Sequence, residues 1–167
     1  MIPVSTWETV GRLVLAAFLG MIIGLERELG GQPAGERTHA LAALGSAAFG
    51  LISLQAFPAG DQARVAAGVV TGLGFLGAGM ILQRDEGVQG LTTAAGIWAV
   101  GAIGLAIGAG QYLLGLTSAA LVGVILALEQ IFKIDQRLAA RKAAREADLQ
   151  RSTPDDLGRG DSQRLDH

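Results

Sequence analysis

Charged and hydroxyl side chains in this sequence gather in the short segments that separate long apolar runs. If the runs form a bundle of helices, the segments at one end of the bundle bring these side chains into a single polar layer. Carboxylates, guanidinium groups and hydroxyls held in one layer can bind ions, so we take this layer as the first candidate site. Its predicted members are Glu26, Arg27, Glu28, Arg37, Thr38, His39, Arg84, Asp85, Thr92 and Thr93.

Three kinds of chemistry fit this layer. Magnesium prefers oxygen ligands and keeps several of its waters, so Glu26 and Glu28 are candidate ligands for a weakly bound Mg²⁺ ion, and we predict no other cofactor. Arg37 lies beside the first amides of a predicted helix and could hold an anion. Histidine ionises near neutral pH, so His39 could act as a sensor. A structural alternative stays open, in which charges at helix ends pair with one another and with lipid headgroups.

A glycine pattern, GLGFLG at Gly72, Gly74 and Gly77, matches the G-x-G-x-x-G motif of dinucleotide-binding proteins. That motif requires a soluble strand–turn–helix unit and an acidic residue about 20 positions later at the next strand. Here the charged link 83–86 and a second charge-free apolar run follow it. This context favours helix packing, because helices in lipid approach one another through small residues.

Composition argues against an enzyme or a nucleic-acid-binding protein. The chain contains no cysteine, and its sequence offers neither a nucleophile paired with a base nor a cluster of histidines for a metal. We therefore predict no catalytic residue. The net charge of −2 and the pI near 5.6 provide no basic surface for nucleic acid.

Apolar runs of membrane-spanning length set the predicted fold. Half of the residues are hydrophobic, and Val65 to Leu82 carries no ionisable side chain, which is about the length that a helix needs to cross a hydrocarbon core roughly 30 Å thick. We predict an all-α integral membrane protein, a bundle of five transmembrane helices within residues 1–132. The predicted spans are 7–25, 40–57, 65–82, 91–107 and 112–132.

Basic residues predict the orientation. With the N-terminus outside, four basic positions are cytoplasmic, and Arg64 lies in an outer loop; they are Arg27, Arg37, Arg84 and the tail that starts at Lys133. The positive-inside rule therefore predicts an outside N-terminus and a cytoplasmic C-terminal tail. The basic spacing within 133–151 predicts a cytoplasmic helix that could contact anionic headgroups. Residues 152–167 are polar and lack periodicity, so we expect disorder there.

Local patterns predict how several helices begin. Ser5 and Glu8 fit a capping box, and Glu8 also pairs with Arg12 four residues later, so that Arg12 can extend toward the interface. Asp61 is a candidate cap for the third helix and Thr92 for the fourth. Polar residues from Glu26 to His39 predict a loop.

Small residues at helical spacing predict where helices touch. Close approach at glycine gives the packing contacts that helices in lipid otherwise lack. The predicted packing positions are Gly68, Gly72, Gly74, Gly77, Gly104, Gly108, Gly115 and Gly123.

The predicted spans carry no ionisable residue at mid-depth, where a proton- or cation-coupled carrier normally has one. This favours a protein that acts through contacts within the membrane, with a second copy or another membrane protein as partner. A transporter of magnesium or another small ion is the alternative.

Four sequence blocks in order resemble the MgtC/SapB family of bacterial inner-membrane proteins. They are GLERELGG at Gly24–Gly31, ERTHALAALGS at Glu36–Ser46, RVAAGVVTGLGFLGAGMIL at Arg64–Leu82 and GLTTAAGIWAVGAIGLA at Gly90–Ala106.

The resemblance implies a multi-pass protein of the bacterial inner membrane with a role in adaptation to low magnesium, in stress or intracellular survival, and in virulence. It also implies either magnesium transport or regulation of another membrane protein, for which the F-type ATP synthase is one proposed partner. Many family members carry a soluble C-terminal domain, and we expect this chain to correspond to the membrane domain alone.

Overall fold

A computed structural model describes residues 4–57, 59–84, 87–129 and 145. It divides the chain into a unit of residues Met1–Leu128 and a second unit from Glu129 onward, and the description below concerns the first. The predicted basic helix at 133–151, apart from Arg145, and the predicted disordered tail at 152–167 lie outside the described residues.

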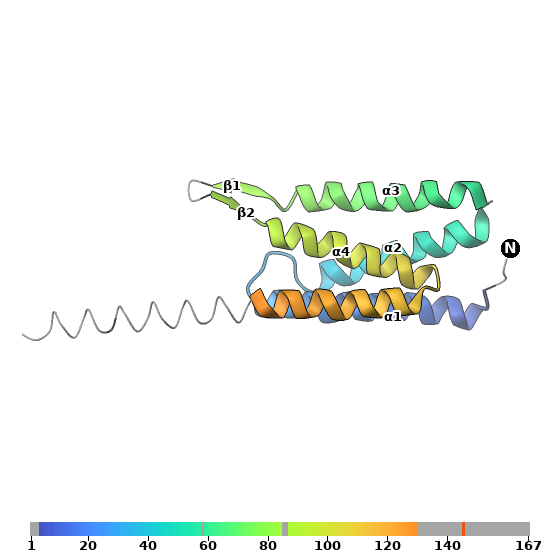
Figure 1. Cartoon of the computed structure of the whole chain (residues 1–167), viewed down its shortest axis with the longest axis horizontal. Helices are drawn as coiled ribbons and strands as arrows, with labels where there is room; N and C mark the ends of the chain where they lie inside the picture. Colours follow the sequence, from blue (N-terminus) through green and yellow to red (C-terminus); the bar gives the residue numbers. More distant parts are fainter. Residues whose placement is uncertain (1–3, 58, 85–86, 130–144, 146–167) are drawn as a thin grey trace, which may run out of the picture. The chain divides into compact units, whose positions relative to one another are not determined.

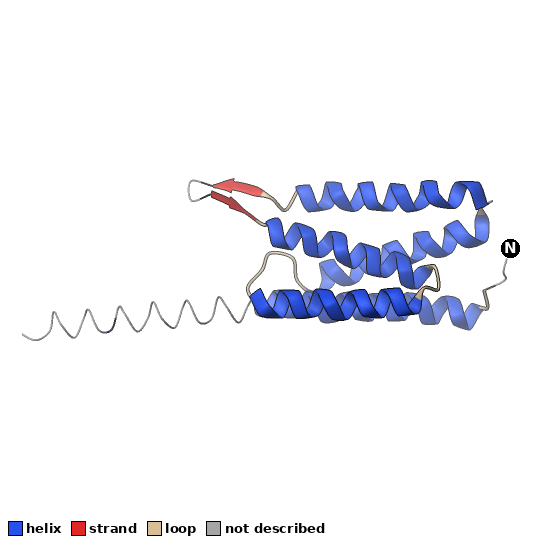
Figure 2. Cartoon of the chain, in the orientation of Figure 1, coloured by secondary structure: helices blue, strands red, loops and turns tan. Residues whose placement is uncertain are grey.

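Helices make up nearly all of this unit (Figures 1 and 2). In chain order the elements are α1 (Thr6–Leu29), α2 (Glu36–Ala56), α3 (Ala59–Ala78), β1 (Leu82–Arg84), β2 (Gly87–Gln89), α4 (Leu91–Gly108) and a last helix at Tyr112–Glu129. Among the described helices, four are long and apolar enough to cross a membrane, namely α1, α2, α4 and Tyr112–Glu129. The helical architecture is confirmed.

One part of the link after the third helix differs from the prediction. The two short strands β1 and β2 form an antiparallel hairpin in which Leu82 pairs with Gln89 and Gln83 with Val88. The spans predicted from the sequence leave a plain link at 83–90 and extend the third span to Leu82. The helix ends earlier, at Ala78, and Leu82 belongs to β1.

The first two helices extend into the predicted polar loop. Glu26, Arg27 and Glu28 continue α1 to Leu29, since glutamate and arginine favour helix almost as much as leucine does. Gly31, at φ 71°, turns the chain after it, and α2 already begins at Glu36. The connection is thus 30–35 rather than 26–39, and both polar groups lie on helical turns.

Two predicted caps are wrong. Asp61 lies inside the first turn of α3, which starts at Ala59 directly after Pro58, and it pairs with Arg64 at 3.6 Å. Helix α4 begins at Leu91, and its N-cap is Gly90 at φ 89°, a backbone conformation that Thr92 would adopt only with strain. The Ser5 cap is confirmed, because its hydroxyl accepts a hydrogen bond from the Glu8 amide at 3.2 Å.

Helix α2 is held at backbone distance by glycines of two other helices. On α1, a Cβ atom at Gly20 would lie 2.5 Å from the carbonyl oxygen of His39. On α4, Cβ atoms at Gly104 and Gly108 would collide with the carbonyl oxygens of Ala43 and Ala47. Only glycine permits these crossings. The core cluster formed around them contains Ala16, Ile23, Ala43, Ala47, Val100, Ile103, Ile107 and Leu126.

The predicted packing glycines fall into two groups. The covered group lies against a neighbouring helix and comprises Gly77, Gly104, Gly108 and Gly115. The open group, where an added Cβ would meet no atom within 4 Å, comprises Gly68, Gly72, Gly74 and Gly123. Three of the open glycines are on α3, the helix that packs against α2 and α4 only through one face.

Arg12 joins three helices at the end where α1 starts. Its guanidinium donates to the Gly108 carbonyl at 2.8 Å and to the Tyr112 hydroxyl at 3.1 Å, and it also contacts Glu8. The Glu8 pairing is confirmed. The Arg12 side chain is buried, because its guanidinium reaches the carbonyl at the end of α4, where the helix dipole favours a cation. That Arg12 extends toward the membrane interface stays a prediction.

The α2 crossing generates a stability prediction. Gly104→Ala is expected to lower the free energy of unfolding by about 1 to 3 kcal/mol, because the added methyl group meets a backbone atom that cannot rotate away. The measurement is unfolding in mixed detergent micelles followed by circular dichroism. Gly74→Ala is the matched control, since a Cβ there meets no atom within 4 Å, and it should be neutral or stabilising by up to about 1 kcal/mol. Equal losses in both variants would contradict the crossing.

Candidate functional site

The polar layer predicted from the sequence forms where α1 ends and where α2 and α4 begin. Arg27 lies in the last turn of α1, His39 in the first turn of α2 and Thr93 in the first turn of α4. Arg27 and His39 are 0% exposed and Thr93 is 1% exposed. Buried polar side chains normally have hydrogen-bond partners, and each of these three forms at least one hydrogen bond.

Both candidate magnesium ligands are bound to protein groups. The Glu26 carboxylate accepts two hydrogen bonds from Arg27, at 2.8 Å from Nε and 3.3 Å from Nη2. The Glu28 carboxylate accepts from the backbone amide of Glu36 at 3.1 Å and so caps α2, whose N-cap Gly35 has no side chain to do it. Within the described residues, no group of three or more histidine or acidic side chains is placed to hold a metal ion.

His39 is enclosed by glycines on two other helices. A Cβ at Gly24 of α1 would lie 2.9 Å from the His39 Cβ, and one at Gly96 of α4 would lie 3.5 Å from Nε2. The ring nitrogen Nδ1 donates to the Gly35 carbonyl at 2.9 Å, because a carbonyl oxygen can only accept. Nε2 is buried and has no hydrogen-bond partner among the described residues. The ring therefore acts mainly as a packed wedge between α1, α2 and α4.

Residues outside the predicted set complete this layer. Gln32, in the loop after α1, accepts a hydrogen bond from the Thr93 hydroxyl at 3.4 Å. Gly24 and Gly96 make room for His39. Gly20 and Gly24 have the same four-residue spacing as Gly68 and Gly72, so the sequence contains a signal for this contact. No periodic signal marks Gln32, because it lies in a short loop.

Other members of the predicted set point away from this centre. Arg37, Thr38 and Thr92 are exposed on the first turns of α2 and α4. Arg84 belongs to β1, and Asp85 lies outside the described residues. The layer thus consists of a buried inner group, which joins the helix ends, and an exposed outer group. The inner group is Arg27, His39 and Thr93, and the outer group is Arg37, Thr38 and Thr92.

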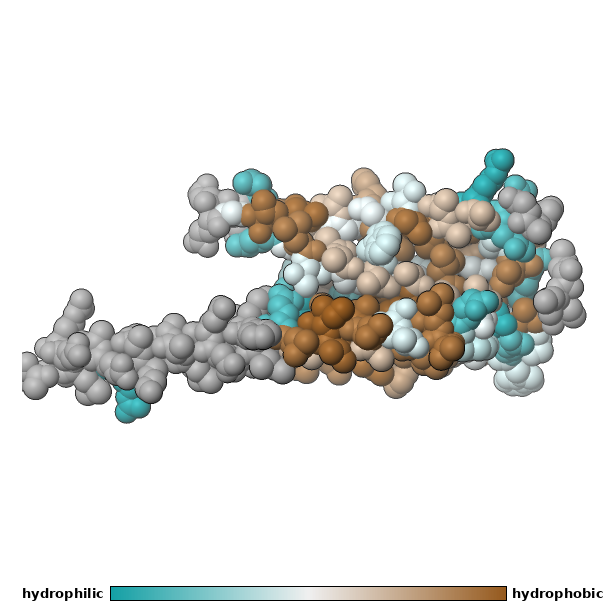
Figure 3. Space-filling model, viewed as in Figure 1, coloured by the Kyte–Doolittle hydropathy of each residue, from teal (hydrophilic) through white to brown (hydrophobic). Residues whose placement is uncertain are grey.

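The surface between the two ends is strongly apolar. Figure 3 shows brown, hydrophobic residues along the middle of the bundle and teal, hydrophilic ones toward its ends. Leu113 is 82% exposed and Phe75 is 80% exposed. Large apolar side chains exposed at this level suit a surface covered by hydrocarbon.

Comparison with known proteins agrees with this architecture. The sequence profile of the MgtC family matches residues 13–134. The chain belongs to the MgtC family. The family resemblance recognised in the sequence is thereby confirmed, and the protein is a membrane protein with transmembrane helices.

Individual relatives are similar over most of this chain. "Putative magnesium transporter YhiD" of Escherichia coli (strain K12) is 45% identical over 141 residues, which cover 80% of this chain and 65% of that protein. "Protein SrpB" of Synechococcus elongatus is 42% identical over 157 residues, covering 83% and 82%. "Protein MgtC" of Salmonella typhimurium is 45% identical over 100 residues, covering 60% and 43%. No solved structure matches the chain.

The inner group yields a prediction that separates packing from surface chemistry. His39→Ala is expected to lower the free energy of unfolding by about 2 kcal/mol or more, since it leaves a cavity between three helices. Thr38→Ala, at the exposed neighbouring position, should change it by less than about 0.5 kcal/mol. Detergent unfolding of both variants is the measurement. A His39→Ala variant as stable as the parent would show that the ring is not a structural wedge.

Proposed function

We propose that this MgtC-family protein is a multi-pass protein of the bacterial inner membrane that supports adaptation to low magnesium through contact with another membrane protein. The contact is non-catalytic, and the partner is a second copy or a different protein, with the F-type ATP synthase as the candidate that the family resemblance provides.

One observation carries the proposal: ionisable side chains of the described helices lie near the helix ends. In α1, no ionisable residue lies between Arg12 and Glu26. Helix α4 contains no ionisable residue. Between those ends, glycine crossings bring the α2 backbone directly against α1 and α4. A coupled ion carrier normally has an ionisable group at this depth, so the arrangement supports a role through contacts.

Helix α3 offers the surface for such a contact. Its outward face carries Val70, Gly74 and Phe75, and Phe75 is 80% exposed. A Cβ at Gly74 would meet no atom within 4 Å. Small residues beside an exposed aromatic ring allow a partner helix to approach closely, and close approach drives helix association in lipid.

The proposed orientation includes α3 as a fifth span and leaves the N-terminus outside. Arg27, Arg37 and Arg84 then lie on the cytoplasmic side and Arg64 on the other, in agreement with the positive-inside rule. Reporter enzymes fused to each terminus test the orientation. Activity that places both termini in the same compartment would exclude five spans.

Magnesium transport is the second candidate, because one relative carries the name "Putative magnesium transporter YhiD". It predicts Mg²⁺ flux into proteoliposomes that Glu26→Ala abolishes. Our proposal instead predicts a deletion strain that grows poorly at low magnesium while the purified protein gives no flux above protein-free vesicles.

Crosslinking in native membranes tests the proposed contact. The chain contains no cysteine, so Phe75→Cys creates a single site for a thiol-reactive photocrosslinker. The expected result is one adduct of defined mass, identified by mass spectrometry as a membrane protein or a second copy. Leu113→Cys, equally exposed but on the last helix, is the matched control and should give no such adduct. Recovery of uncrosslinked monomer alone, or the same adduct from both sites, would refute the contact on α3.

A further inference from the structure

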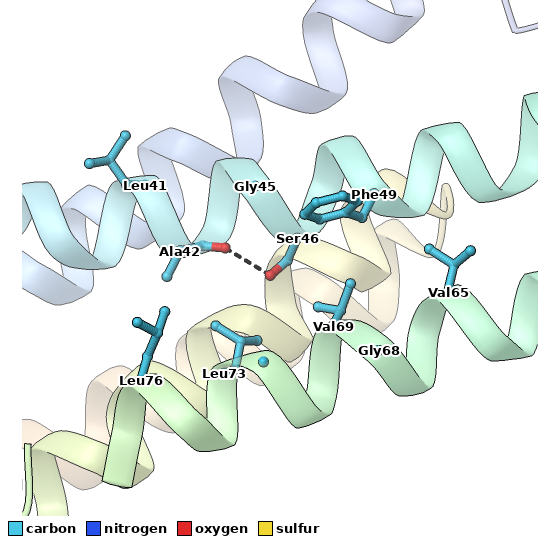
Figure 4. A pocket seen from close by; sticks show the side chains of 11 residues that line it. Leu41, Ala42, Gly45, Ser46, Phe49, Val65, Gly68, Val69, Leu73 and Leu76 are labelled. Atoms are coloured by element: carbon cyan, nitrogen blue, oxygen red, sulfur yellow. Dashed lines mark hydrogen bonds between the residues drawn. The ribbon is translucent and has the colours of Figure 1, made fainter. Parts of the chain in front are cut away.

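An apolar groove of about 570 Å³ runs between α2 and α3 (Figure 4). Five of the residues that line it come from α2 and six from α3. They are Leu41, Ala42, Gly45, Ser46, Phe49, Val65, Gly68, Val69, Gly72, Leu73 and Leu76.

The lining of the groove leaves no polar group for a ligand. Ser46 is the one hydroxyl residue in it, and this hydroxyl already donates to the Ala42 carbonyl at 2.7 Å, as Figure 4 shows. A polar molecule would lose its hydrogen bonds to water there without replacement. The groove therefore suits hydrocarbon.

Missing side chains create the space. Gly68 and Gly72 lie one turn apart on the α3 wall, and a Cβ at either position would meet no atom within 4 Å. Gly45 widens the α2 wall in the same way. The groove therefore exists because these three positions are glycine, where a larger side chain would fit.

A cation and a hydroxyl lie at the end of the groove where α2 begins. Arg37 precedes Leu41 by one turn and Thr38 precedes Ala42 by one turn, so both continue the α2 wall beyond the apolar lining. Both side chains are exposed. The described part of the chain gives Arg37 neither an ion pair nor a hydrogen bond, in contrast to Arg27 nearby.

We propose that the groove binds an acyl chain of an anionic phospholipid whose phosphate lies at Arg37. The apolar walls match the acyl chain of such a lipid. The exposed Arg37 and the Thr38 hydroxyl, at the end of the groove where α2 begins, match its phosphate. Basic residues at this depth attract anionic headgroups. Val70 and Gly74 lie on the other side of α3 from this groove, whereas Phe75 borders it three residues after Gly72. The inference stands without the proposed protein contact.

A second copy of the chain fits this groove less well. An apolar helix seated in the groove would leave the exposed Arg37 without an anion, because the groove lining and the described part of the chain supply none. A phospholipid supplies an apolar chain and a phosphate together.

Native mass spectrometry of the delipidated protein tests this proposal, with phosphatidylglycerol and phosphatidylcholine of identical acyl chains as probes. The parent should bind phosphatidylglycerol more tightly. Arg37→Gln should lose about fivefold of that preference and still bind both lipids, since one basic residue near the surface contributes on this scale. Arg64→Gln removes an equally exposed arginine at the other end of α3 and should leave the preference unchanged.

Filling the hollow tests the acyl-chain part. Gly72→Leu should reduce binding of both lipids at least fivefold, whereas Gly74→Leu, on the same helix but outside the lining, should bind as the parent does. Detergent unfolding checks that both variants fold.

Three outcomes would overturn the proposal. They are an unchanged lipid preference in Arg37→Gln, equal losses in the two leucine variants, and disulfide-linked dimers formed by Gly68→Cys in membranes.

Discussion

The backbone of α2 lies against the backbones of α1 and α4, and the rest of the bundle depends on this contact. Helices in lipid gain little from the hydrophobic effect against one another, so stability comes from many close van der Waals contacts. Glycines on the two flanking helices allow those contacts on both sides of α2, at Gly20 and Gly24 and at Gly104 and Gly108. The three helices form a closed half of the protein, and the last helix joins it through Leu126 and Gly115.

The placement of charge follows from the apolar surroundings of the helices. An ionisable side chain at the middle of a membrane-spanning helix is costly, so such groups remain at the ends. There they connect neighbouring helices. Arg12 donates a hydrogen bond to the Gly108 carbonyl at the end of α4, and the Glu28 carboxylate accepts one from the first amide of α2. The paired charges of the polar layer thus serve the fold first. Arg37, exposed and without a partner in the described chain, is the exception that remains available to something outside the protein.

The sequence predicts an element well where a single physical effect, such as hydrophobicity or helix capping, determines the local structure. The charge-free run between Gly90 and Gly108 predicted α4 almost to the residue, and the Ser5 hydroxyl predicted the start of α1. The prediction is wrong where two effects, such as side-chain polarity and helix propensity, favour different structures. Glu26 to Glu28 are polar, which suggested a loop, yet they are also good helix formers and continue α1. The contact of Arg12 with the Gly108 carbonyl could not be predicted, because the two residues lie 96 positions apart in the chain.

The candidate site shows the same limit more sharply. Gly20 and Gly24 have the spacing of Gly68 and Gly72, but the first pair is covered by α2 and the second pair is open. Spacing identifies a glycine face, whereas tertiary arrangement alone decides whether the chain itself covers it. Likewise Arg27, Arg37 and His39 all flank helix ends in the sequence, and only the fold separates the two buried side chains from the exposed one.

Both proposed contacts concern α3 for this reason, because the chain leaves part of this helix uncovered. Helix α3 contacts α4 where Leu73 inserts against Gly101 and where Gly77 meets Ala94. Near its start, the Gln62 carbonyl accepts a hydrogen bond from Ser53 of α2 at 3.1 Å. Other parts of its surface stay open, because an added Cβ at Gly68, Gly72 or Gly74 would meet no atom within 4 Å. A glycine-rich helix with few partners is costly to keep in a membrane unless its hollows are filled from outside. In our two proposals, an acyl chain fills the groove toward α2 and a partner helix contacts the outward side, so both concern the part of α3 that the described chain leaves uncovered.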